Sequence, residues 1–498
     1  MRTRSLVQDN PSPPMATVTR SRRQFLGTAT GAALGWLAGC APLPTSRSQS
    51  WSSLAAGLQG PLLMPGNANF AAHAQPWALQ YATALPQAIA QCASEEDVGT
   101  CLKWANSNNV PLVARSGGHS YAGYSTTTGL MIDVSAMNTV KVDAVSGIAV
   151  VAGGARNKHV YAACRPLERA VTHGRCRDVG VAGLVLGGGI GFNMRAHGLT
   201  CDSLIETRIV LADGRTLTCN ASENADLFWA CRGAGGGNFG VHTSFTFQTY
   251  PVGRYTVFDM QWTEQLIEVF AALQDMAMSA PNGLGMKLGV TAQAGEAGLT
   301  LNILGQFAGS QADFLALLAP VFLVRKPRKS VVEERGYWDA QEFVSEDGAP
   351  EYSHERSRFV RGTLSATAIQ TIFSSLREWP GTTVAATWKF FLMGGKIDDI
   401  SPSDMAFVNR GYSMLSSIEL EWTQADSFAL LTKNQVWLSR FHERMAEYTS
   451  AHCYQNFIDT SQSDYLHAYY GENLPRLQAI KRKFDVTNLL RYPQSIPA

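Results

Sequence analysis

The chain has 498 residues, of which 45% are hydrophobic and 16% charged, and 41 basic residues nearly balance 40 acidic ones. This composition excludes a disordered chain, and a net charge of +1 gives nucleic-acid binding little electrostatic support. Because the length exceeds that of one ordinary core, we expect two domains of one interlocked body. The nine cysteines show no CxxC pair and no zinc-like spacing with histidine, so no metal site is expected.

Residues 1–45 are interpreted as an export signal. Ser21-Arg22-Arg23-Gln24-Phe25-Leu26 precedes a moderately apolar stretch, a pattern typical of twin-arginine signals, which a receptor recognises. Leu37-Ala38-Gly39-Cys40 resembles a lipobox and makes Cys40 a candidate for a lipid anchor; cleavage by an ordinary signal peptidase is the alternative. Residues 46–69 are expected to form a tether. The chain is therefore expected in the periplasm or another extracytoplasmic compartment.

Alternating and apolar runs predict mixed helix and sheet layers in the next part of the chain. Strands are expected over 87–92, 110–114, 130–134, 140–143 and 148–152. A helix is expected from the capping residue Ser94, with acids in its first turn, to about Asn106. Strands and a helix with buried apolar faces favour α/β layers.

Two glycine-rich stretches stand out. Arg115 to Ser125 reads RSGGHSYAGYS, and its glycine pair allows a sharp turn whose main-chain N–H groups can approach a bulky anion. A surface turn that happens to contain a histidine is the alternative for this stretch taken alone. From Gly174 to Gly191, seven of 18 residues are glycine and most others are small and apolar. This second stretch predicts main chain packed flat against something large.

A third glycine run, Gly235 to Gly240, fits the GxGxxG pattern of a dinucleotide-binding turn. Such a turn must open a helix, so that the helix N-terminus meets the pyrophosphate. The following residues, 241–247, instead alternate with period two and predict a strand. We therefore reject a dinucleotide-binding Rossmann turn here.

The second half of the chain predicts a sheet covered by helices. Helices are expected over 261–278 and 312–319, and a further helix is expected to end near Tyr448. Strands are expected over 286–292, 299–304, 385–391 and 417–422. This part is a candidate substrate domain.

Four stretches occur in order, namely Arg115–Ser125, Gly174–Gly191, Asp226–Gly240 and Tyr454–Ser495. Together they resemble the berberine-bridge-enzyme-like branch of the vanillyl-alcohol-oxidase type of FAD-linked oxidases, over about residues 70–498. The resemblance implies an α+β (mixed α/β) fold. It implies a two-part FAD-binding domain at 70–252, a substrate domain at 253–450 and a segment at 451–498 that returns to the FAD domain.

The resemblance also implies two covalent bonds to the flavin, from His119 to the 8α-methyl group and from Cys176 to C6. A thiol among glycines beside a planar ring is accessible, whereas a thiol in an apolar core is inert. For His119 the structural alternative is a histidine whose hydrogen bonds are satisfied within its own turn. For Cys176 it is a small buried apolar residue. The other implied cofactor-binding residues are Arg115, Ser116, Gly117, Gly118, Ser120, Tyr124, Val179, Gly180, Gly183, Gly187, Gly188, Gly191, Val241 and Asn456.

In similar oxidases two tyrosines serve the reaction, and these correspond to Tyr454 as the base and Tyr121 as its assistant. A free phenol has a pKa of about 10, so a base working near pH 7 needs a nearby cation or strong hydrogen-bond donor. Lys389 and Arg410 are candidates by position alone. Valine at position 179 resembles family members that admit molecular oxygen, which favours an oxidase producing hydrogen peroxide. A dehydrogenase with another electron acceptor is the alternative.

These expectations describe an exported FAD enzyme that oxidises an alcohol or sugar. Two alternatives remain open from the sequence. One is an amine or ring-closing oxidase, or a dehydrogenase, on the same scaffold. The other is a flavin-free lipoprotein that uses the fold to bind a ligand.

Overall fold

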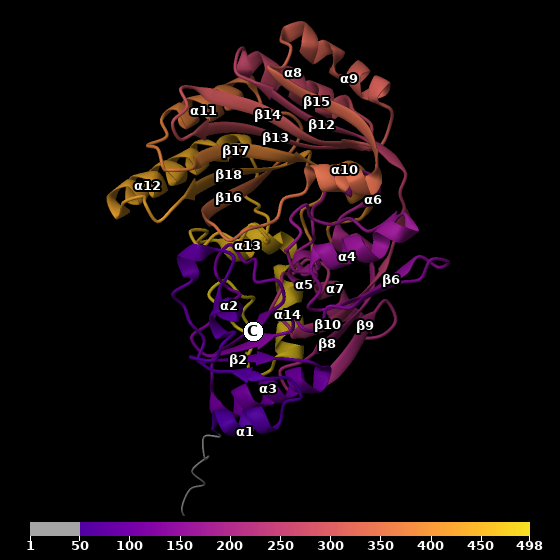
Figure 1. Cartoon of the computed structure of the whole chain (residues 1–498), viewed down its shortest axis with the longest axis vertical. Coiled ribbons are helices and arrows are strands. Elements are labelled where there is room, and N and C mark those ends of the chain that lie inside the picture. The colour runs from indigo at the N-terminus through magenta and orange to yellow at the C-terminus, as the bar shows by residue number, and fades with distance from the viewer. Residues whose placement is uncertain (1–49) are drawn as a thin grey trace, which may run out of the picture. The chain divides into compact units, whose positions relative to one another are not determined.

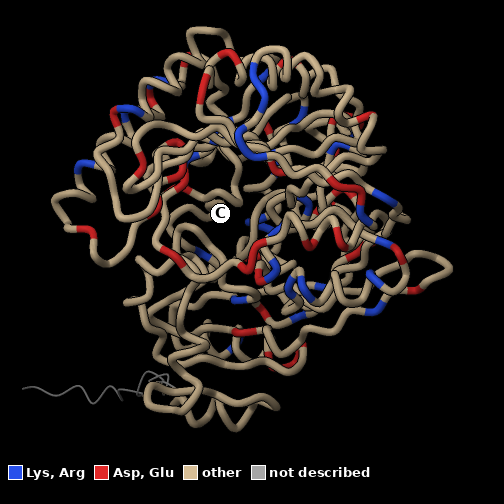
Figure 2. Tube along the Cα trace, turned by 45° about the horizontal axis from the view of Figure 1, so that its top comes forward, with Lys and Arg blue, Asp and Glu red and all other residues tan. Residues whose placement is uncertain are grey.

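The computed structural model describes residues 50–498, which belong to a single unit. The predicted signal over 1–45 and the candidate anchor Cys40 lie outside the described residues. In the described part, no helix has the length and apolar character needed to cross a bilayer. Basic and acidic residues are both scattered over the trace (Figure 2), in keeping with the net charge of +1.

The first sheet of the described chain has four strands in the order β1-β2-β4-β3, and β2, β4 and β3 are parallel. α3 (Glu95–Asn108) begins at Ser94, whose hydroxyl accepts the N–H of Asp97, as predicted. The strands are β1 (Leu62–Leu63), β2 (Ala88–Gln91), β3 (Leu112–Arg115) and β4 (Leu130–Asp133).

The tether predicted over 46–69 is wrong for much of its described part. α1 (Trp51–Ala56) packs against α3, where the rings of Trp51 and Trp104 lie 4.6 Å apart, and β1 pairs with β2. Leu54 is buried in this contact. The apolar residues among the serines and alanines therefore hold residues 51–63 against the first sheet.

The second sheet has five antiparallel strands in the order β5-β6-β10-β8-β9. The third glycine run leads into β10, which confirms that it opens a strand and not a helix. The strands are β5 (Val140–Val142), β6 (Ile148–Ala152), β8 (Leu204–Val210), β9 (Thr216–Asn220) and β10 (Val241–Gln248). The elements around them are α2 (Phe70–Ala74), α4 (Asn157–Cys164), α5 (Val181–Leu186), α6 (Met194–His197), α7 (Ala225–Ala230), β7 (Arg169–Ala170) and β11 (Tyr250–Pro251).

The third sheet has seven antiparallel strands, and four helices cover one of its faces (Figure 1). Its order is β15-β12-β14-β13-β17-β18-β16. The strands are β12 (Arg254–Trp262), β13 (Leu284–Gln293), β14 (Leu299–Phe307), β15 (Lys329–Gly336), β16 (Tyr352–Val360), β17 (Ala385–Leu392) and β18 (Met414–Trp422). The covering helices are α8 (Leu266–Ser279), α9 (Gln311–Val324), α11 (Ala366–Arg377) and α12 (Phe428–Arg444).

The alternation of side chains decides what each face of this sheet can do. Met286, Leu288 and Val290 of β13 are buried in the core beneath the helices. The residues between them, Lys287 and Gly289, point to the opposite face, because successive side chains of a strand point to opposite sides. One face is therefore apolar and covered, and the other is free to be polar.

The helix predicted over 261–278 begins later, at Leu266. Residues 254–262 form β12, which pairs with β14 and β15. The sequence patterns did not predict β15, β16 or α10 (Tyr337–Val344). β15 lies at an edge and carries exposed charges, so it lacks a clear apolar run.

The closing segment contains α13 (Tyr465–Tyr470) and α14 (Leu474–Phe484), and it packs on the third glycine run. Lys481 is fully buried, pairs with Asp485 at 2.7 Å and donates a hydrogen bond to the carbonyl of Asn238. Lys483 forms an ion pair with Asp226 at 2.6 Å. These contacts tie residues far apart in the sequence to one another.

Candidate active site

A cavity of about 790 Å³ lies between the glycine-rich stretches and the uncovered face of the seven-stranded sheet. That size is typical of sites for small molecules and cofactors. Sixteen of the predicted site residues line it: Arg115, Ser116, Gly117, Gly118, His119, Ser120, Tyr121, Tyr124, Cys176, Val179, Gly180, Gly183, Gly191, Val241, Tyr454 and Asn456.

Gly187 and Gly188, also predicted to bind the cofactor, are not among the residues that line the cavity. A Cβ on Gly187 would lie 2.0 Å from Oδ1 of Asn456, and one on Gly188 would lie 2.8 Å from the ring of Phe407. Gly187 therefore allows Asn456 of the closing segment to approach the main chain, and Gly188 allows the ring of Phe407 to do so.

We call the main chain of residues 116–120, 179–183, 190–191 and 235–237, which runs along one side of the cavity, the glycine wall. A Cβ on Gly117 would lie 2.3 Å from the main-chain nitrogen of Gly180, so the first two stretches touch backbone to backbone. Gly235 and Gly237 have φ values of +86° and +76°, which favour glycine over other residues. Much of the wall is main chain with N–H groups, because glycine is its commonest residue, and this suits a large group that bears phosphates.

His119 lies in this wall with its ring stacked on Trp77 at a centroid distance of 4.1 Å. Burial lowers the pKa of His119 to about 4, so its imidazole is neutral at pH 7. Its Nε2 is buried and has no hydrogen-bond partner among the described residues. Unpaired buried nitrogens are rare and point to a missing partner. Trp77 is not among the predicted site residues, because it lies outside the four motifs.

Cys176 lies close to His119. A Cβ on Gly348 would be 3.5 Å from both Nε2 of His119 and Cβ of Cys176, so these two atoms are at most twice that distance apart. The Cys176 thiol donates a hydrogen bond of 2.5 Å to Oε1 of Glu346. Burial, and then the Glu346 carboxylate, raise the pKa of this thiol. The structure thus brings together both residues that the resemblance implies as flavin attachment points.

The segment of residues 345–351, which we call the crossing segment, runs past both residues on its way from α10 to β16. The N–H of Arg177 donates to the carbonyl of Glu346 at 3.1 Å, and the N–H of Glu346 donates to the carbonyl of Arg175 at 3.3 Å. At its far end, Glu351 exchanges main-chain hydrogen bonds with Trp77 and Leu79. The segment is therefore held near one end by residues 175–177 and at the other end by residues 77–79.

Tyr454 is 1% exposed and its hydroxyl receives two N–H donors. Gly189 donates from its main chain at 3.1 Å, and Asn456 donates from Nδ2 at 3.0 Å. Burial raises the pKa of Tyr454, and both donors act in the opposite direction. The ring of Tyr121 stacks between Trp77 and Phe457, at centroid distances of 5.0 and 5.5 Å.

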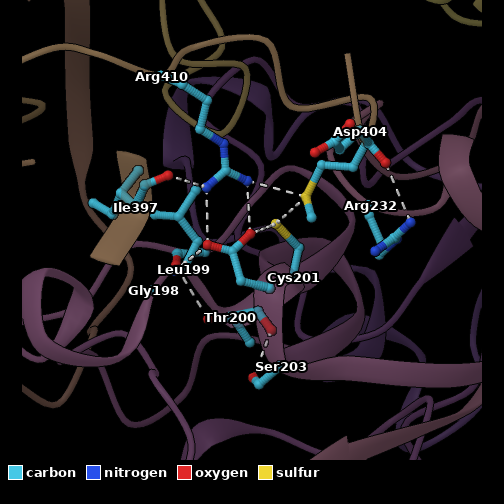
Figure 3. Close-up of polar contacts among 12 residues, drawn as sticks. Gly198, Leu199, Thr200, Cys201, Ser203, Arg232, Ile397, Asp404 and Arg410 are labelled. Atoms are coloured by element: carbon cyan, nitrogen blue, oxygen red, sulfur yellow. Dashed lines mark hydrogen bonds and ion pairs between the residues drawn. The ribbon is translucent and has the colours of Figure 1, made fainter. Parts of the chain in front are cut away.

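Neither cation proposed to assist Tyr454 does so. The Arg410 guanidinium pairs with Asp202 at 2.6 Å and donates to the carbonyl of Ile397 at 2.8 Å (Figure 3). Lys389 pairs with Glu419 at 2.6 Å and with Glu355 at 3.1 Å. Both cations are paired with carboxylates of residues far from them in the sequence, so position in the sequence does not reveal these partners.

We call the polar residues that face the cavity from the third sheet and its neighbour Glu351 the sheet wall. Carboxylate oxygens of Glu351, Glu419 and Glu421 lie within 4.8 Å of one another. Burial, and then Glu419, raise the pKa of Glu351 to about 8 and that of Glu421 to about 7. Burial, and then Arg175, lower the pKa of Lys287 to about 7. Polar residues alternating with apolar ones in β13, β17 and β18 are the sequence signal for this wall.

Comparison with known proteins agrees with this geometry. Residues 86–220 match the model of an FAD binding domain, and residues 453–497 match the model described as berberine and berberine like. The chain is 31% identical over 420 residues to an uncharacterized FAD-linked oxidoreductase, YgaK, of Bacillus subtilis, covering 83% of this chain and 91% of the relative. It belongs to the berberine-bridge-enzyme-like FAD-linked oxidoreductases.

Solved structures of this family superpose on the chain. The BBE-like 1 protein of Physcomitrella patens matches with a TM-score of 0.82 and 26% identity, over 90% of this chain and 99% of that one. The glucooligosaccharide oxidase of Acremonium strictum matches with a TM-score of 0.78 and 26% identity, over 90% and 99%. The mixed α/β fold and the FAD cofactor follow, and the alternative of a flavin-free binding protein is set aside.

Proposed function

We propose that this FAD-linked oxidoreductase oxidises a hydroxyl group of a sugar and returns the electrons to molecular oxygen as hydrogen peroxide. The observation that carries the proposal is the cavity itself, in which Tyr454 and the attachment candidates lie across from the polar sheet wall. The similarity to a glucooligosaccharide oxidase supports a sugar as substrate.

FAD supplies the hydride acceptor, and the chain supplies binding and orientation. The main-chain N–H groups of the glycine wall would hold the phosphates, and Val241 would contact the adenine or ribose side. We further propose that His119 and Cys176 both bind the flavin covalently. The solved glucooligosaccharide oxidase of Acremonium strictum has a 6-S-cysteinyl, 8α-N1-histidyl FAD, which supports this assignment.

Tyr454 is the proposed base that takes the proton of the substrate hydroxyl. Its oxygen accepts hydrogen bonds from Gly189 and Asn456, and these donors would stabilise the negative charge when the phenol loses its own proton. Tyr121 would position the substrate through its fixed ring. Val179 lines the cavity, and we propose that its side chain is small enough to let molecular oxygen reach the reduced flavin.

An amine substrate is the second candidate. Three carboxylates gather in the cavity, at Glu351, Glu419 and Glu421, and they would favour a cationic group. Ring-closing oxidation of such a substrate belongs to the same candidate.

Export by the twin-arginine route completes the proposal. That route carries folded proteins and suits a cofactor installed in the cytoplasm, and Cys40 would then provide a membrane anchor. Replacing both Arg22 and Arg23 by lysine should retain the protein in the cytoplasm, and Cys40→Ala should release it from the membrane fraction. Unchanged fractionation of either variant contradicts the corresponding step.

The enzymatic proposal is tested with the purified protein and a panel of oligosaccharides, monosaccharides, alcohols and amines. Bleaching of the flavin without air identifies the substrate, and peroxide release in air identifies the acceptor. Sugars that bleach the flavin and release peroxide support the proposal. Bleaching without peroxide indicates a dehydrogenase, and bleaching by amines alone indicates the second candidate. Flavin that stays with the protein after acid precipitation supports covalent attachment.

A further inference from the structure

Glu346 of the crossing segment is placed directly against the thiol of Cys176. Its two carboxylate oxygens have different partners: Oε1 accepts the thiol hydrogen at 2.5 Å, and Oε2 pairs with Arg175 at 2.7 Å. Main-chain hydrogen bonds to the residues on either side of Cys176 fix the register of this contact. Among the described residues, Glu346 is the acceptor that the thiol has in the cavity.

Burial and the charges around this pair keep the thiol protonated, and the charges keep the carboxyl ionised. Burial, and then the carboxylate itself, raise the pKa of the Cys176 thiol. Burial acts to raise the pKa of Glu346 as well, but Arg175 holds it below its usual range. Lys287 and Lys389 face the same carboxylate from the sheet wall and act in the same direction as Arg175. A thiolate formed in advance is therefore scarce at pH 7, so the proton must leave as the sulfur reacts.

We propose that Glu346 is the base that removes the thiol proton when Cys176 becomes attached to the flavin ring. The inference rests on the covalent attachment in the proposed function. The S–H bond breaks and its proton passes to the Glu346 carboxylate. A sulfur–carbon bond replaces a ring C–H bond, whose hydrogen leaves as a second proton. The two electrons left over pass to molecular oxygen, which takes up two protons and leaves as hydrogen peroxide.

The position of Glu346 suits this role better than a purely structural one. Its side chain is 43% exposed beside the cavity, so the carboxylate is accessible where the ring would lie. Glu342, one turn earlier in α10, pairs with Arg177 of the same motif but does not contact the thiol. It is the matched control, because it also forms a salt bridge with an arginine next to Cys176 but makes no contact with the thiol.

The test follows attachment at Cys176 in protein sampled at intervals after a short pulse of expression and then held in air. Mass spectrometry of the peptide that contains Cys176 gives the fraction carrying flavin. Wild type and Glu342→Ala should become attached at the same rate. Glu346→Ala should be slower by about a hundredfold or more, the effect expected for loss of a general base. Sodium formate, a small carboxylate that fits the space, should accelerate Glu346→Ala but not the larger Glu346→Gln.

Each outcome decides a different point. If wild type carries no flavin on Cys176, the two-bond attachment fails, and the role of Glu346 fails with it. Equal rates for wild type and Glu346→Ala overturn only the role of Glu346. A folded Glu346→Ala that is slow but insensitive to formate also overturns it, because Glu346 would then act by holding the crossing segment in place. Thermal unfolding of each variant establishes that it is folded.

Discussion

The two walls of the cavity recognise ligands by opposite means. The glycine wall presents mostly main chain, and a Cβ at Gly117 would collide with the backbone of Gly180. The sheet wall presents side chains, such as Lys389 and Glu419, on strands whose backbone is already fully paired. The first wall can change little without losing its shape, whereas the second can change residue by residue. A family with one cofactor and many substrates is expected to divide its cavity in this way.

Tyr454, the proposed base, should show the largest effect. Tyr454→Phe removes the hydroxyl that Gly189 and Asn456 contact, and it should slow substrate-driven flavin reduction by about 10²- to 10⁴-fold. Stopped-flow absorbance without air measures this rate. Tyr448→Phe, outside the cavity, is the control. Reduction of Tyr454→Phe at the wild-type rate would rule out its role as the base.

The glycine wall should be intolerant of one added methyl group. Gly117→Ala places a Cβ 2.3 Å from a backbone nitrogen and should lower the free energy of unfolding by about 3 kcal/mol, with a loss of bound FAD. Urea unfolding and the ratio of flavin to protein absorbance measure the two effects. Gly253→Ala is the matched control, because no atom lies within 4 Å of its added Cβ. Equal stability of the two variants would show that the wall can adjust.

A substitution at Val179 tests whether a side chain of the glycine wall limits the access of oxygen to the reduced flavin. Val179→Leu should leave the rate of flavin reduction unchanged and slow reoxidation in air by about tenfold, a barrier increase of ~1.4 kcal/mol. The return of flavin absorbance after mixing with oxygen gives this rate. Val436→Leu, on the exposed face of α12, is the control. Unchanged reoxidation of Val179→Leu would remove the argument for an oxygen path at this residue.

The sheet wall should show the smallest effect, and one that depends on pH. The pKa of Glu351 is about 8 in the folded protein, above the usual value for a glutamate. A carboxyl with a raised pKa stabilises the fold below its unfolded pKa, and this stability is lost as pH rises toward 8. Glu351→Gln, which stays neutral, should therefore gain thermal stability over wild type progressively from about pH 4.5 to pH 8.

Thermal unfolding across this pH range measures the difference for Glu351→Gln. Glu296→Gln, on the exposed surface, should give a difference that does not vary with pH in this way. A difference from wild type that does not vary with pH for either variant would show that burial and Glu419 do not raise the pKa of Glu351.

Local patterns predicted many elements and failed where an element lacked its own apolar run. The helix after Ser94 and the strand after Gly240 follow from capping and from period-two alternation. β15 was missed because its neighbours in the sheet, and not its own sequence, make it a strand. Trp77 and Glu346 were missed because they reach the site from outside the glycine-rich motifs.

The family, the FAD cofactor and the residues on the glycine-rich side of the cavity could be inferred from the amino-acid sequence alone, because the glycine-rich stretches and the order of the motifs are local features of the sequence. Which charges meet could be learned only from the folded chain. Folding pairs Arg410 with Asp202 and Lys389 with Glu419, leaves main-chain and amide donors for Tyr454, and sets Glu346 against the thiol of Cys176. Ion pairs and hydrogen bonds depend on distances of a few ångströms between residues far apart in the sequence, and only folding sets those distances.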